Sequence, residues 1–213
     1  MSIMPLMLCR FILLATLFSP LHAWAAEDAL LTQIASQTAQ HEVVQARFTQ
    51  HKQMAALKRP LITEGRLVYS RAHGVLWQIE KPYRITYLLG EQQIVEIAAD
   101  GSRKQRGIKD IPGLAQVGRI FRAMLGADTA TLQTQFEVKA SGQPTAWDIT
   151  LQPKQAQVRQ FLTALQLTGG QFVQTIHIDE ASGDQTLLKF SDTQATSLPS
   201  AEDLRLLESI KTK

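Results

Sequence analysis

The chain has 213 residues, 45% of them hydrophobic, and a formal net charge of +3 at pH 7. This charge is too small to indicate a nucleic acid or an anionic membrane as a partner. The single cysteine, Cys9, excludes a disulfide within the chain.

The first 25 residues have the composition of a secretory signal peptide. Arg10 is their only charged side chain, residues 11–18 form an apolar block, and residues 23–25, Ala-Trp-Ala, offer a cleavage site. The block is too short to span a membrane. We predict a signal peptide over residues 1–25, one domain over 26–213, and a periplasmic location. Without Arg10, the 22 Lys and Arg become 21 against 19 Asp and Glu, a net charge of +2.

The next segments predict a helix followed by a meander of strands. Residues 28–41 place Leu30, Leu31 and Ile34 near one face of an amphipathic helix. From Val43 the apolar residues alternate, and turn residues divide the chain up to residue 99 into short strands. This spacing is typical of antiparallel strands.

The second half predicts another helix and more strands. Residues 112–125 have helical spacing, with Pro112 at the start and Gly126 just after the end. Two strands are predicted over residues 133–140 and 146–153, and a short helix or turn over 155–160. A hairpin over residues 161–179 turns at Gly169-Gly170, and another strand follows over 185–193. A terminal helix is predicted over residues 201–211, with Ser200 at its N-cap position. About 9–11 strands in one antiparallel sheet must curl or split.

Few residues indicate chemistry. The histidines at 41, 51, 73 and 177 lack metal-ligand spacing, and no nucleophile or phosphate-binding motif is present. We therefore predict no catalytic residue, no metal and no cofactor. A lipid hydrolase or transferase is the alternative, and it requires a histidine, an acidic partner and a nucleophile together in a cavity.

A basic segment stands out after the meander. Arg103, Lys104, Arg106 and Lys109 fall within seven residues. The pattern is that of a solvated loop or of a docking patch for an acidic protein partner. The large apolar residues of the strands also have two interpretations, a packed core or the wall of a cavity. Periodicity alone cannot distinguish between them.

The order of motifs resembles the LolA-type family of outer-membrane lipoprotein carriers. The matching residues are Phe48-Thr49-Gln50, Gly65-x-Leu67, Arg71 with Trp77 six residues later, and Pro82. The resemblance implies an α+β fold, an incomplete antiparallel barrel with helices as a lid over a hydrophobic cavity. It also implies a monomeric carrier, not an enzyme, that takes acylated lipoproteins from an inner-membrane transporter to an outer-membrane acceptor.

The resemblance assigns roles to several residues. Arg71 would latch the lid. The cavity would be lined by Phe48, Leu67, Tyr69, Trp77, Ile79, Tyr87, Ile94, Trp147, Ile149, Phe172 and Ile176. The lid helix would contribute Leu114, Val117, Ile120 and Phe121.

Two departures from the family pattern bear on the cargo. Ala72 and His73 follow the arginine, and the segment that holds Leu57 and Pro60 is extended. This looks like a branch that accompanies synthesis of aryl polyenes or related glycolipids, so the cargo is a lipoprotein or another amphiphilic lipid. The alternative is a periplasmic lipid-sensing adaptor of the same fold that binds a protein partner through residues 103–109.

Overall fold

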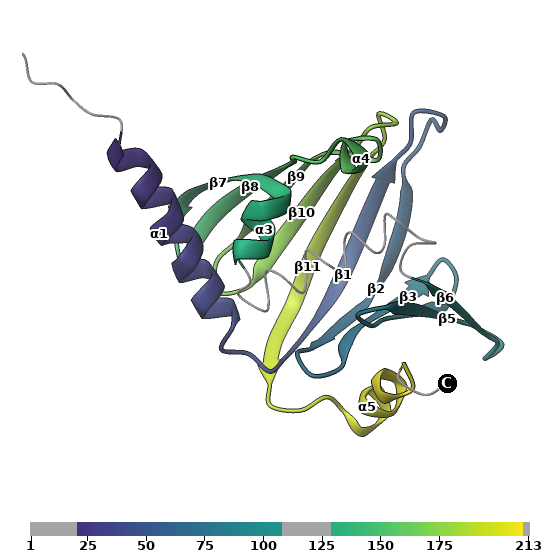
Figure 1. The fold of residues 1–213 in the computed structure, drawn as a ribbon. Helices are drawn as coiled ribbons and strands as arrows, with labels where there is room; N and C mark the ends of the chain where they lie inside the picture. The colour runs from purple at the N-terminus through teal and green to yellow at the C-terminus, as the bar shows by residue number, and fades with distance from the viewer. Residues whose placement is uncertain (1–20, 108–128, 211–213) are drawn as a thin grey trace, which may run out of the picture.

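A computed structural model describes residues 21–107 and 129–210 of the chain. Its main feature is one antiparallel sheet of eleven strands in the order β6-β5-β4-β3-β2-β1-β11-β10-β9-β8-β7 (Figure 1). The strands are β1 (Val43–Gln53), β2 (Leu61–Ser70), β3 (Gly74–Lys81), β4 (Ile85–Leu89), β5 (Gln93–Ala98), β6 (Arg103–Gly107), β7 (Phe136–Gln143), β8 (Ala146–Pro153), β9 (Leu162–Gly169), β10 (Val173–Glu180) and β11 (Gln185–Thr196). Because β6 and β7 are its two edges, the sheet is not closed. The predicted large, unclosed antiparallel sheet is confirmed.

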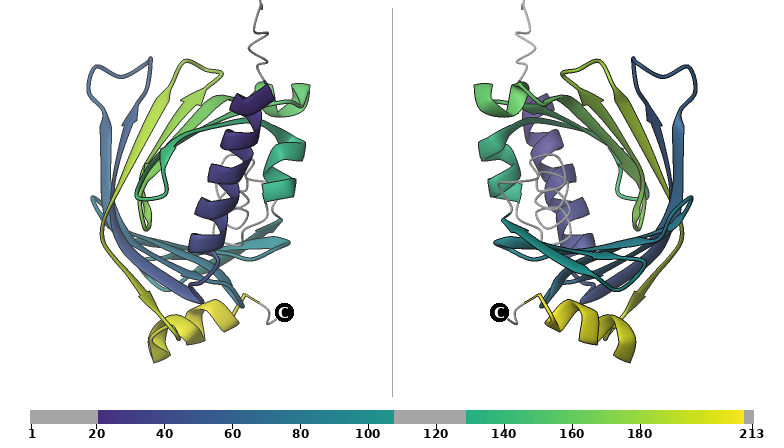
Figure 2. Two further views of the ribbon diagram at one scale, coloured as in Figure 1. Left: turned by 90° about the vertical axis from the view of Figure 1, so that its left-hand side faces the viewer. Right: turned by 90° about the vertical axis from the view of Figure 1, so that its right-hand side faces the viewer.

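Helices lie on both sides of the curved sheet. In the described residues they are α1 (Leu21–Thr38), α3 (Thr129–Gln135), α4 (Ala156–Arg159) and α5 (Ala201–Glu208). Figure 2 shows α1 and α3 on the concave side and α5 beneath the opposite side of the sheet. None of these helices is long and apolar enough to cross a membrane.

The first helix differs from its predicted bounds. It begins at Leu21, inside the predicted signal peptide, and ends at Thr38 rather than at residue 41. Cleavage after Ala25 would leave residues 26–38 of this helix. The predicted helix over 112–125, with Leu114, Val117, Ile120 and Phe121, lies outside the described residues.

Both faces of the sheet bury apolar side chains. Along β3, Val75, Trp77 and Ile79 belong to one buried cluster together with α1 and α3, and this side is called the inner face. Leu76 belongs to a second cluster with Leu207 of α5, and this side is called the outer face. The separation follows from the alternation of side chains along a strand.

Two segments correct the predicted elements. The strand expected over 133–140 begins only at Phe136, because α3 occupies the residues before it. Residues 103–107 of the basic segment are not a loop, because they form β6 and pair with β5. Charged residues are common on edge strands, where they hinder pairing with other chains. The hairpin at Gly169-Gly170 and the cap at Ser200, whose side chain accepts from the N–H of Asp203, are confirmed.

Candidate functional site

The inner face gathers most of the residues predicted to line a cavity. Phe48, Leu67, Tyr69, Trp77, Ile79, Tyr87, Trp147, Ile149, Phe172 and Ile176 belong to the inner cluster or pack against it. Ile94 is buried and pairs with Leu89, an inner-face residue, so its side chain points the same way. The strands β1–β4 and β7–β11 all contribute to this apolar surface.

An aromatic stack lies near the middle of the inner face. The rings of Phe48 and Trp77 are 4.1 Å apart between centroids and inclined by 29°. Gly65 pairs with Phe48 across β1 and β2, and a Cβ there would lie 2.9 Å from Cζ of Phe48. The absence of a side chain at residue 65 therefore lets the phenyl ring cross β2 and reach Trp77.

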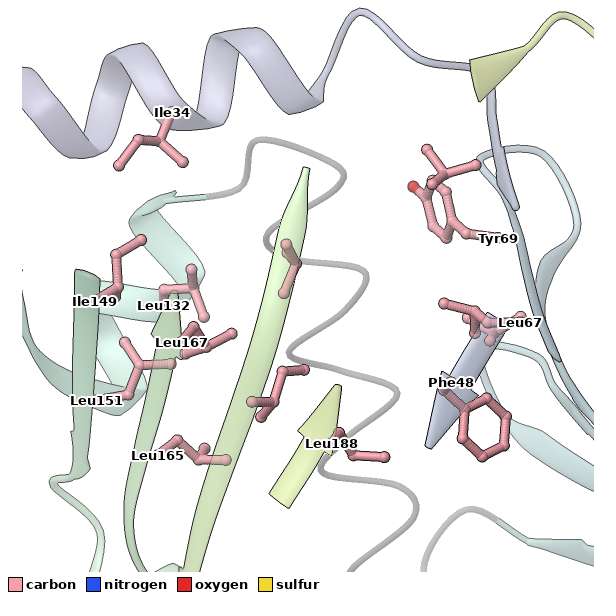
Figure 3. Packing of buried hydrophobic residues seen from close by; sticks show 14 of the residues in the cluster. Ile34, Phe48, Leu67, Tyr69, Leu132, Ile149, Leu151, Leu165, Leu167 and Leu188 are labelled. Carbon is pink, nitrogen blue, oxygen red and sulfur yellow. The ribbon is translucent and has the colours of Figure 1, made fainter. Parts of the chain in front are cut away.

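The inner face is closely packed where α1 and α3 cover it. Figure 3 shows Ile34 of α1 directed toward Leu132 of α3 and Ile149 of β8. A crevice among Leu31, Ile34, Ala35, Thr129, Leu132, Ile149 and Leu151 leaves about 10 Å³ for the centre of a water molecule. That is room for about one water. This crevice cannot hold an acyl chain, so the described residues do not show a lid over an open cavity.

Arg71 joins the β2–β3 turn to the segment between α1 and β1. Its Nη2 donates to the carbonyl oxygens of Ala39 and His41, the second at 3.4 Å. Its Nε lies 3.6 Å from Oε1 of Glu42, and its backbone N–H donates to the carbonyl of Glu42 at 3.0 Å. Arg71 therefore holds the segment that follows α1, which ends at Thr38. Its role as a latch stays a prediction.

The C-terminal end of α1 and the segment after it also contact the β9–β10 hairpin. Gln37 Nε2 donates to the carbonyl oxygen of Gly170 at 3.4 Å. The buried Trp147 Nε1 donates to the same oxygen at 2.7 Å, and the ring centroid of His41 lies 5.2 Å from that of Phe172. No pattern in the sequence indicates these contacts, except for the Gly169-Gly170 turn that bends the hairpin.

The basic segment divides between the two faces. Arg103 Nη2 donates to Ser209 Oγ at 2.7 Å, which places it on the outer face beside α5. Lys104 pairs with Glu96, and Arg106 pairs with Ile94, on the inner face. Lys109 lies outside the described residues. The three described cations therefore lie on two faces of the sheet, and their role in docking a protein partner stays a prediction.

A polar network fixes α5 to the outer face. Asp203 is almost fully buried, and its Oδ1 lies 2.8 Å from Nη2 of Arg66 while its Oδ2 accepts from Ser200 Oγ at 2.7 Å. Burial acts to raise the pKa of Asp203, but hydrogen bonds from Arg66 and Ser200 outweigh it, and the pKa lies below its usual value. Leu207 is fully buried in the same interface.

The pair of Ser70 and His73 does not form the site that a lipid hydrolase requires. Ser70 Oγ and His73 Nδ1 are 3.1 Å apart, but Ser70 pairs with Val43 of the outer cluster and so points away from the inner face. None of the described hydrogen bonds brings a carboxylate to His73. Within residues 21–107 and 129–210, no group of three His, Cys, Asp or Glu residues could hold a metal ion.

The family model described as "outer membrane lipoprotein carrier protein LolA-like" matches residues 23–208. No curated protein matches the chain. Among solved structures, a LolA superfamily protein from Nitrosomonas europaea is 11% identical over 88% of this chain and 97% of its own, with a TM-score of 0.48. The lipoprotein LppX from Mycobacterium tuberculosis is 12% identical over 81% and 98%, with a TM-score of 0.45. The Pseudomonas aeruginosa MucA/MucB complex contains a chain 12% identical over 84% and 60%, also at 0.45. The family model spans most of the sequence, and the chain therefore belongs to the LolA-like family of outer membrane lipoprotein carrier proteins.

Proposed function

We propose that the protein is a periplasmic carrier that shields the acyl chains of lipoproteins or related amphiphilic lipids and takes them toward the outer membrane. No bond is made or broken in the carrier. The observation that carries this proposal is the apolar inner face of an unclosed sheet, shared by β1–β4 and β7–β11 and covered in part by α1. Family membership supports the same conclusion.

The helix α1 must move for a chain to reach the surface beneath it. Leu31 and Ile34 are packed into the inner cluster, and the crevice beside them has room for about one water. Burying each methylene of a chain gains about 0.8 kcal/mol, so twelve methylenes contribute about 10 kcal/mol before ordering costs. Displacing Leu31 and Ile34 opposes this by about 1.5–3 kcal/mol for each side chain.

This competition gives the carrier a means of release. A chain that replaces α1 on the inner face binds less tightly than its buried area suggests, because α1 returns when the chain leaves. The covered state also hides an apolar surface that would otherwise aggregate. The donor would be an inner-membrane transporter and the acceptor an outer-membrane protein.

Native mass spectrometry tests the proposal. The protein is delipidated and mixed with an acylated peptide or with the same peptide lacking the acyl group. We expect a one-to-one complex with the acylated peptide alone, and lipid extraction of protein purified from the periplasm should recover a long-chain amphiphile. Equal binding of both peptides, or no binding, would contradict the proposal.

A matched pair of variants tests whether the acyl chain binds to the inner face. Ile85 is a half-buried residue that packs on the inner cluster, and Ile97 is its half-buried counterpart on the outer cluster. Ile85→Gln should weaken acyl binding, whereas Ile97→Gln should leave it unchanged. Equal effects of the two substitutions would show that binding does not use the inner face.

A further inference from the structure

The apolar inner face ends in two cations at the β6 edge. Across β3, β4, β5 and β6, one row of paired residues runs Trp77, Tyr87, Glu96 and Lys104. Directly paired residues in antiparallel strands point to the same side of the sheet. Lys104 therefore shares the inner face with Trp77, three strand spacings away, or about 14 Å.

A second row ends the same way. It runs Val75, Leu89, Ile94 and Arg106, so a cation directly follows three buried apolar side chains. Every residue of β6 is exposed, and no ion pair between described residues includes Lys104 or Arg106. Among the described residues, neither cation has an ion-pair partner, and each stands at the end of a row of paired inner-face residues.

The pKa of Tyr87 supports the placement of Glu96 and Arg106 on the inner face. Burial raises the pKa of its hydroxyl, Glu96 and Tyr83 raise it further, and Arg106 acts to lower it. The hydroxyl is therefore close enough to Glu96 and Arg106 to respond to both charges. Glu96 is a carboxylate that opposes an anion at this edge, and Asp100 is a second one, close enough to interact with the charge of Lys104.

We propose that Lys104 and Arg106 bind the anionic headgroup, a phosphate or a carboxylate, of an amphiphile whose acyl chain lies on the inner face toward Trp77. This inference rests on the proposed carrier function and deepens it, because it selects anionic cargo over uncharged cargo. It also explains why the basic segment divides between two faces: Arg103 attaches β6 to α5 through Ser209, while the other two cations face the cargo.

Two lipids with the same acyl chain test the proposal. A lysophosphatidylglycerol carries one phosphate, and a monoacylglycerol carries no charge. We expect the wild-type protein to bind the phosphate lipid about tenfold more tightly at low salt, since each surface cation near an anionic lipid contributes about 1 kcal/mol or less. The preference should shrink as ionic strength rises.

Three variants separate a headgroup site from a general effect of charge. The double variant Lys104→Glu/Arg106→Glu should lose the preference and keep its affinity for monoacylglycerol. Arg103→Glu, on the same strand but the outer face, should keep the preference. Glu96→Gln should increase it. Circular dichroism confirms that each variant is folded.

The outcomes distinguish this inference from the carrier proposal. If the double variant keeps the preference, or if Arg103→Glu loses it equally, Lys104 and Arg106 only protect a sheet edge and the inference is wrong. If the wild-type protein binds both lipids equally, the inference fails and the carrier function stands. If it binds neither lipid, the carrier function fails as well.

Discussion

Replacing Arg71 with alanine should release the segment that follows α1, and with it the C-terminal end of the helix, and so strengthen cargo binding. A hydrogen bond to a charged group contributes about 1.5–3 kcal/mol. The side chain of Arg71 is 33% exposed, and one of its two carbonyl contacts is long at 3.4 Å. We therefore assign the contacts of the Arg71 side chain about 1.4 kcal/mol after allowing for solvent screening, which is a tenfold change in an equilibrium.

In the carrier proposal, the energy of the Arg71 contacts changes the affinity of the protein for its cargo. If α1 covers the inner face in most molecules, the apparent dissociation constant is the intrinsic one divided by the uncovered fraction. Arg71→Ala should raise that fraction about tenfold, and an acylated fluorescent probe should bind about tenfold more tightly and dissociate more slowly. Hydrogen exchange at the backbone amides of residues 30–38 should become faster.

A matched arginine controls for the loss of charge. Arg47 lies on the outer face and pairs with Glu80 at 2.7 Å, away from α1. Arg47→Ala should leave probe binding and exchange in α1 unchanged. If Arg71→Ala accelerates exchange but does not change affinity, α1 does not control access to the inner face. If exchange is unchanged as well, Arg71 does not hold the helix.

Three further predictions concern stability, each measured by chemical denaturation. Gly65→Ala should destabilise the fold by about 1–3 kcal/mol, because the new methyl would overlap the carbonyl oxygen of Gln78. Asp203→Asn should cost about 1–3 kcal/mol at pH 7 through its pair with Arg66. The pKa of Asp203 is lowered in the fold, so this contribution is complete above the unfolded pKa of about 3.9 and is lost as pH falls through the folded value; a constant difference between wild type and variant down to pH 2 would contradict the assignment. Leu207→Ala should cost about 2–4 kcal/mol, because Leu207 is fully buried under α5.

The sequence predicts most of the strands because their apolar residues alternate. The pattern from Val43 to residue 99 yields β1–β5 nearly as the structure has them. It does not yield β6, whose residues Arg103–Gly107 have no apolar alternation and form a strand only because β5 pairs with them. The face of each cation follows from that pairing, so the division of the basic segment could not be predicted.

The sequence does not identify which side chains of β3 point to the inner face, and the reason is physical. The helix α5 covers the outer face of β3, so Leu76 is as deeply buried as Val75 and Trp77 beside it. A strand covered on both faces is apolar almost throughout, and its period does not identify the side that could meet a ligand. The hydrogen-bond partners of Arg71 could not be predicted from the sequence either, because they lie about thirty residues earlier in the chain.

In the carrier proposal, acyl chains occupy the inner face and not the outer one. Nuclear Overhauser effects between the protons of a bound fatty acid and the methyl groups of the protein test this directly, because they arise only between protons in close contact and β3 and β4 carry buried methyl groups on both faces. Val75 and Leu89 point inward, and Leu76 and Leu88 point outward. We predict such effects from bound fatty acid to the methyl groups of Val75 and Leu89 and none to those of Leu76 and Leu88. Equal effects at both pairs, or none at any of the four residues at saturating fatty acid, would contradict the proposal.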